Sequence, residues 1–212
     1  DSLVAEHIDE DTEFIPLLTL EDEEEIERER IPHVLPILPL KNTVLFPGVV
    51  VPITAGRDAS IHLINEAYAT TKTIGVVAQL DEKTEIPEGK DLFRFGTVAR
   101  ILRVLKMPDG NVTIIIQGKK RFEIESFVEE KPYIKAVIKE MSDVKPEPND
   151  KEFEATIDAV KDLSIKIIQE NPNIPSEAAF AIRNIESYSF LINFISSNMN
   201  ATVLEKQGVL EI

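Results

Sequence analysis

The sequence predicts an α+β fold in which a mixed β pseudo-barrel containing one helix is followed by an α-helical bundle. Apolar residues between positions 33 and 141 recur mostly with a period of two, the spacing typical of β-strands. From position 151 the apolar period changes to 3.6, the spacing of amphipathic helices. The stretch between them holds two prolines and several charged residues and is typical of a linker. We therefore expect an acidic leader, a β domain, a linker and a helical bundle, with bounds at 1–30, 31–142, 143–150 and 151–212.

The chain carries a formal net charge of −15, and most of this charge lies in the leader. Residues 1–30 hold thirteen Asp or Glu against Arg28 and Arg30, whereas residues 31–142 are close to neutral. The leader has too few apolar residues to offset the conformational entropy that it would lose on ordering. We therefore expect a disordered, solubilising leader. Two alternatives stay open. One is a solvated helix over 21–30, and the other is a segment that folds onto a partner through Phe14, Ile15, Leu17, Leu18 and Leu20.

Residues 36–53 alternate apolar residues of strand-forming type with prolines. Proline has no backbone N–H, so we expect it at the edge of a sheet rather than in its centre. The stretch therefore predicts two short edge-like strands joined by a tight turn at Phe46, Pro47 and Gly48. A large apolar side chain such as that of Phe46 suits a turn only if something packs on it.

The clearest element is a hairpin, with strands at 98–106 and 112–117. Its turn is Pro108-Asp109-Gly110-Asn111, in which proline presets one dihedral angle, Asp bonds its own backbone and Gly accepts a left-handed conformation. The β domain is completed by a helix that begins at Asp58, a possible N-cap, and by strands at 74–80, 121–125 and 133–141.

Beyond the linker the apolar positions predict four helices. The first has one apolar face formed by Phe153, Ile157, Val160, Ser164 and Ile167, and it ends near Pro172. We expect the second to be capped by Ser176, the third to follow a break near Ser187, and the last to begin at Thr202 or Val203. The chain has no initiator Met and ends inside this last helix, so we expect a fragment of a longer protein.

The sequence shows no catalytic motif. A P-loop needs a glycine, four residues, then Gly-Lys-Ser/Thr, and neither Gly89-Lys90 nor Gly118-Lys119 fits that pattern. Ser196 and Ser197 have no activating base nearby in sequence, so we expect a structural role for them. We therefore expect that the chain has no catalytic residues and neither hydrolyses ATP nor cleaves a protein.

Metal, membrane and secretion signals are missing as well. The chain has no Cys, which excludes disulfides and thiolate zinc sites and fits a cytoplasmic location. His7, His33 and His62 are isolated from one another, so we expect no metal site and no cofactor in this fragment. No apolar run approaches the roughly 20 residues that span a bilayer, so we expect no membrane partner.

Five groups of residues, in this order and spacing, carry a family resemblance. They are Leu38-Pro39-Leu40 with Phe46-Pro47-Gly48, residues 95–101, Pro108-Asp109-Gly110, Gln117-Gly118 with Arg121-Phe122, and Glu205-Lys206-Gln207 with Leu210-Glu211. Together they resemble the N-terminal domain of bacterial ATP-dependent Lon proteases over residues 31–212.

This resemblance implies a PUA-like β domain joined to a helical bundle. In whole Lon these precede an ATPase domain that uses ATP and Mg and a serine-lysine peptidase domain, within a hexamer. It also implies a non-catalytic fragment that recognises unfolded or damaged proteins and contacts other Lon subunits during assembly. Two alternatives stay open: a free-standing domain of the same fold that binds proteins, and an RNA-binding module.

Substrate recognition predicts exposed apolar side chains at loop tips, which would hold the apolar segments of damaged proteins. The candidates are Phe46, Pro47, Met107 and Pro108. For each of them the alternative role is packing between the β domain and a neighbouring element.

The RNA alternative depends on a basic cluster, since PUA-like folds often bind RNA. Its members are Arg100, Arg103, Lys119, Lys120 and Arg121. The acidic segments on both sides of the β domain would repel a polyanion, so we favour a solvated face and no nucleic-acid partner.

Overall fold

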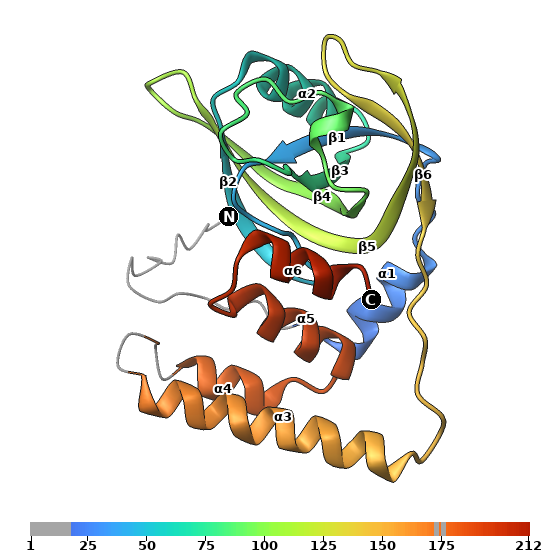
Figure 1. Cartoon of the computed structure of the whole chain (residues 1–212), viewed down its shortest axis with the longest axis vertical. Coiled ribbons are helices and arrows are strands. Elements are labelled where there is room, and N and C mark those ends of the chain that lie inside the picture. Colours follow the sequence, from blue (N-terminus) through green and yellow to red (C-terminus); the bar gives the residue numbers. More distant parts are fainter. Residues whose placement is uncertain (1–17, 172–173, 175–176) are drawn as a thin grey trace, which may run out of the picture.

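The structure of the protein is a computed structural model that describes residues 18–171, 174 and 177–212. The strands are β1 (Val34–Leu40), β2 (Val50–Ala55), β3 (Thr73–Ala78), β4 (Phe95–Lys106), β5 (Val112–Glu129) and β6 (Lys135–Glu140). The helices are α1 (Leu20–Arg28), α2 (Asp58–Ala69), the 3-10 helix η1 (Gly89–Asp91), α3 (Lys151–Glu170), α4 (Glu177–Asn184), α5 (Tyr188–Asn198) and α6 (Val203–Leu210). A mixed sheet with α2 beside it, followed by α3 to α6, confirms the predicted α+β class (Figure 1).

The six strands form one sheet that closes on itself. The strand order is β2-β5-β4-β3-β1-β6, and β5 also pairs with β6. β1 and β3 run parallel, whereas the other neighbours are antiparallel. Closure is possible because β5 is eighteen residues long and divides one of its edges between β2, at 112–117, and β6, at 122–129. The separate strands predicted at 112–117 and 121–125 are therefore one strand.

The position of β1 corrects the expectation of an edge-like strand. β1 lies between β3 and β6 in the sheet although it contains Pro36 and Pro39. Pro36 stands in the half of β1 that pairs with β6, and Pro39 in the half that pairs with β3. Within the described sheet, each half of β1 is paired with one neighbouring strand and has no partner strand along its other edge. A proline, which has no N–H to donate, is therefore tolerated in both halves.

The acidic leader also differs from its prediction where the structure describes it. Residues 20–28 form α1, which has a capping box: Asp22 N–H donates to Thr19 Oγ1 (3.2 Å), and Thr19 N–H donates to Asp22 Oδ2 (3.0 Å). The expectation of disorder is therefore wrong for this stretch, and the helix alternative is the one found. Of the predicted anchors, Leu18 packs against the core and Leu20 is half exposed, whereas Phe14, Ile15 and Leu17 lie outside the described residues.

Three apolar clusters form the core. One fills the barrel beneath α2, a second fills its other side around Phe122, and a third joins the barrel to the helices. The third cluster combines barrel residues with residues of α3 to α6, among them Val44, Phe46, Ala78, Ile182, Phe190, Leu191 and Leu210. The helical part therefore shares a core with the barrel, and the unit boundary at 143–150 stays a prediction.

Three of the helices after the linker begin at side-chain caps. Asp150, Ser187 and Thr202 cap α3, α5 and α6 with their side-chain oxygens. The predicted cap at Ser176 lies outside the described residues, and α2 begins at Asp58 after the N-cap Arg57, which makes no side-chain cap bond. Figure 1 shows α6 next to the sheet, α5 beyond it, and the α3–α4 pair farthest away. Among the described residues, no further layer covers the outer side of the α3–α4 pair.

Candidate functional site

The turn at 46–48 is packed inside the molecule. Gly48 adopts φ +77°, a conformation that favours glycine, and its N–H donates to the Gly118 carbonyl (2.9 Å). The turn is thereby held on β5, where a Cβ at Gly118 would lie 2.3 Å from the Phe46 carbonyl oxygen. The Phe46 side chain is 1% exposed and belongs to the cluster between barrel and helices.

The expectation that Phe46 is an exposed loop-tip contact is therefore wrong, and the alternative role of packing between elements is the one found. Pro47, its neighbour in the same turn, is half-buried. The missed signal was the glycine on each side of the contact, at 48 and 118, because only a residue without a side chain lets two backbones approach this closely.

The β4–β5 hairpin presents the other two predicted contacts to solvent. Its turn is the predicted one: Gly110 has φ +89°, and Asn111 N–H donates to Asp109 Oδ1 (3.0 Å). Met107 and Pro108 are exposed, and so are the β4 side chains Leu102 and Leu105. We refer to this exposed hairpin, with Met107 and Pro108 at its tip, as the β4–β5 arm. That the arm contacts substrate stays a prediction.

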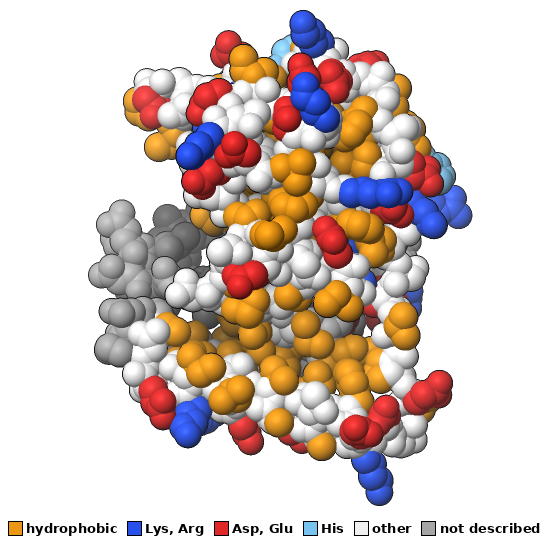
Figure 2. All heavy atoms as spheres, viewed as in Figure 1, with side chains coloured by type: hydrophobic (Ala, Val, Ile, Leu, Met, Phe, Trp, Pro, Cys, Tyr) orange, Lys and Arg blue, Asp and Glu red, His pale blue; other side chains and the backbone are white. Residues whose placement is uncertain are grey.

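A second apolar surface lies on the helices. Figure 2 shows hydrophobic side chains gathered over the region of α3, α4 and α5, around a hollow between them. The large exposed hydrophobic residues of these helices are Leu163, Ile167, Phe180 and Ile192. Phe180 is 70% exposed, Leu163 61% and Ile167 53%. The sequence predicts Ile167 on the apolar face of the first helix after the linker, but Ile167 is not part of that helix's buried face.

The sequence carried a signal for this surface. Leu163, Ile165, Ile167 and Ile168 lie within six residues of α3 and cannot all face one side of a helix with 3.6 residues per turn. Only Ile168 is buried among them. An α-helix with apolar residues around its circumference buries them or offers part of them to another molecule.

Three members of the basic cluster are engaged inside the chain. Lys120 Nζ donates to the Glu29 carbonyl (2.8 Å) and to Glu140 Oε2 (3.1 Å). Lys119 Nζ lies 3.9 Å from Glu29 Oε2. Arg100 and Arg103 on β4 are exposed to solvent.

Arg121 is the most constrained of the cluster, with a side chain 11% exposed. Its Nη2 donates to Asp143 Oδ1 (2.5 Å), and its Nη1 donates to the Leu210 carbonyl (2.8 Å) at the C-terminal end of α6. The guanidinium thus joins β5 to the start of the predicted linker and to the last helix. The expectation of one solvated basic face is wrong for Lys119, Lys120 and Arg121.

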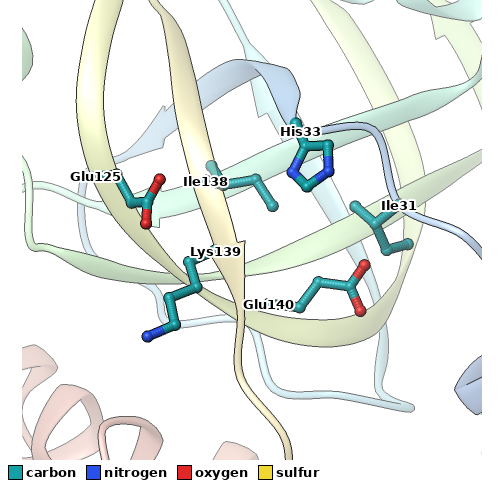
Figure 3. Close-up of a pocket in the computed structure, with 6 residues that line it drawn as sticks. All are labelled: Ile31, His33, Glu125, Ile138, Lys139 and Glu140. Atoms are coloured by element: carbon teal, nitrogen blue, oxygen red, sulfur yellow. The ribbon is translucent and has the colours of Figure 1, made fainter.

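A small hollow of about 240 Å³ lies where β5, β6 and the segment before β1 meet. Figure 3 shows Ile138 between Glu125 and His33, while Lys139 extends away from His33. These side chains do not converge on one point, as a nucleophile and its base must. Ser196, the other candidate considered, is buried in α5.

Two kinds of site are absent from the described residues. No group of three or more His, Asp or Glu side chains is placed to hold a metal ion in the part of the chain that the structure describes. Among the same residues, no helix is both long and apolar enough to span a bilayer.

The fold is that of Lon N-terminal domains. It is similar to the N-terminal domain of Mycobacterium avium complex Lon protease, with a TM-score of 0.69 and 20% identity over 84% of this chain and 90% of that one. It is also similar to a Lon N-terminal domain protein from Xanthomonas campestris, with a TM-score of 0.58, 15% identity and the same coverage.

The chain belongs to the family of ATP-dependent protease La (LON) substrate-binding domains, whose profile matches residues 34–212. The Lon protease of Flavobacterium johnsoniae is 64% identical over the whole chain, and that of Cytophaga hutchinsonii is 50% identical over 95% of it. The chain spans about a quarter of the length of these relatives, 26% and 25%. The family resemblance seen in the sequence is confirmed.

Proposed function

We propose that this chain recognises unfolded or damaged protein segments and holds them for a Lon-type protease of which it is a part. The observation that carries the proposal is the exposure of Leu163, Ile167 and Phe180 on α3 and α4. Leu163 and Ile167 stand one turn apart on α3. Large apolar side chains grouped at a surface often mark a site that binds another molecule. The family description, a substrate-binding domain, supports the same function.

Apolar side chains suit this task because clients of a quality-control protease share exposed hydrophobic residues rather than a sequence. Burying one Leu, Ile or Phe side chain contributes about 1.5–3 kcal/mol, so two or three contacts give a weak and reversible complex. The exposed arm with Met107 and Pro108 would add a second contact region on the barrel.

The parent protein, as proposed from the relatives, is a cytoplasmic ATP-dependent serine endopeptidase. Its ATP, Mg and catalytic serine and lysine would belong to domains outside this chain. We propose further that this domain contacts other Lon subunits and aids assembly of a hexamer. The exposed helical surface would be open to client proteins in that assembly.

The proposal predicts a binding defect for polar changes on α3. Replacing Leu163→Ser and Ile167→Ser together should weaken binding of reduced, carboxymethylated α-lactalbumin, a permanently unfolded protein, at least about tenfold. The measurement is a fluorescence anisotropy titration of the labelled client. Stability should change little, because both side chains are more than half exposed.

Ile86→Ser is the matched control, since Ile86 is 86% exposed in the loop after β3, far along the chain from the helices. It should leave the affinity unchanged. Loss of binding in Met107→Ser alone would move the site to the β4–β5 arm. Equal affinity in all variants would refute recognition through either surface.

A further inference from the structure

The acidic helix α1 lies on a basic part of the barrel. Lys120 donates to the carbonyl of Glu29, which follows α1, and Lys119 faces the Glu29 carboxylate. A cation at this end is favourable because the last carbonyl groups of a helix carry partial negative charge. Lys145, beyond the barrel, pairs with Glu27 Oε1 (2.8 Å). The helix is therefore held by cations from two different segments.

One face of α1 is directed at the barrel. Asp22, Glu25 and Glu29 are spaced three and four residues apart, so they share a face of the helix. They line a hollow of about 560 Å³ together with Ile26, Arg28, Arg100, Gln117 and Lys119. Carboxylates of α1 thus border the same hollow as Arg100 of β4 and Lys119 of β5.

The attachment of α1 is small. Ile26 is the one buried residue of this helix, at 8% exposed, and the ionic contacts of Glu27 with Lys145 lie at the surface. Surface ion pairs contribute little and are weakened further by salt. A helix of nine residues is also too short to be stable alone in water, so it depends on this contact. This attachment is therefore weak compared with the packing inside the barrel.

We propose that the face of β4 and β5 beneath α1 is a binding surface for acidic protein segments, and that α1 occupies it within the same chain. A client segment with carboxylates and one apolar side chain at helical spacing would displace α1. The surface is separate from the apolar surface on α3 and α4. Because α1 covers it in the unmodified chain, it adds no salt dependence to apolar binding until α1 is displaced.

An acidic protein segment fits this surface better than RNA. The occupant α1 buries an apolar side chain, that of Ile26, beside its carboxylates, and a phosphate backbone offers no equivalent side chain. Glu140 pairs with Lys120 and Asp143 pairs with Arg121, so Lys119 and Arg100 are the cations of this surface that a ligand would meet. The carboxylates and the single buried apolar side chain of α1 are the chemistry that we expect a ligand of this surface to share.

The test uses the full chain and a labelled peptide with the sequence of residues 18–30. In the unmodified chain α1 competes with the peptide. The apparent affinity is therefore the intrinsic affinity multiplied by the fraction of molecules in which α1 has left the surface. Two variants open the surface: Ile26→Ser, which removes the buried anchor, and Thr19→Ala with Asp22→Ala, which removes the capping box. Each should bind the peptide at least about tenfold more tightly than the unmodified chain, and the affinity should fall as salt rises.

Adding Lys119→Ala or Arg100→Ala to the open variants should abolish this gain, whereas Arg103→Ala, an exposed cation on the same strand outside the hollow, should keep it. Circular dichroism confirms that each variant is folded. The proposal is overturned if opening α1 does not raise the affinity, if Lys119→Ala and Arg103→Ala behave alike, or if a single-stranded RNA of equal charge binds more tightly than the peptide.

Discussion

Replacing Phe46→Ala should lower the free energy of unfolding by about 3–5 kcal/mol, the cost of removing a buried aromatic side chain. The reason is its position: the ring is almost fully buried in the cluster that joins the turn to Phe190, Leu191 and the other helical residues. The alanine variant would leave a cavity at the junction of barrel and helices. Urea denaturation followed by circular dichroism measures the loss.

Phe180→Ala is the matched control for this change, since it removes the same side chain from an exposed position on α4. Its effect on stability should stay within about 0.5 kcal/mol. A similar loss in both variants, or a loss near zero for Phe46→Ala, would mean that the turn is not part of the core.

The second large effect is expected at Arg121. Arg121→Met keeps the length of the side chain and removes its charge, so the hydrogen bonds to Asp143 and to the Leu210 carbonyl are lost together. Hydrogen bonds to charged groups contribute about 1.5–3 kcal/mol each. The partly exposed Asp143 carboxylate can bind water in place of the guanidinium, so we expect the free energy of unfolding to fall by about 2 kcal/mol.

Arg103→Met is the comparison for this variant, because Arg103 is an exposed arginine on the neighbouring strand. Thermal unfolding of both variants gives the result. If Arg103→Met were as destabilising as Arg121→Met, the contact of Arg121 with the end of α6 would not be a specific source of stability.

The parts of the fold that follow from local physics were predictable from the sequence. The turn at 108–111 forms as its residues indicate, because proline and glycine determine backbone angles without help from distant contacts. The helices α5 and α6 begin after Ser187 and Thr202 for the same reason: a side-chain oxygen binds amides three residues away.

Features that depend on residues far apart in the chain could not be predicted in this way. Phe46 is buried because Gly118 lets the turn approach β5, a contact over more than seventy residues. α1 forms on Lys119 and Lys120, about ninety residues away, although its own composition favours disorder. β1 tolerates its prolines only because its partner strands divide it between them. In each case a tertiary contact outweighs the local preference.

The most direct measurement of the central claim is the affinity of the unmodified chain for one protein in two states, at low and at high salt. We expect the chain to bind reduced, carboxymethylated α-lactalbumin and not to bind the folded, disulfide-intact form, whose apolar residues are buried. Because apolar contacts are not screened by ions, the affinity for the unfolded form should change less than about threefold with salt. Equal binding of both forms, or an affinity that collapses at high salt, would contradict recognition through exposed apolar side chains.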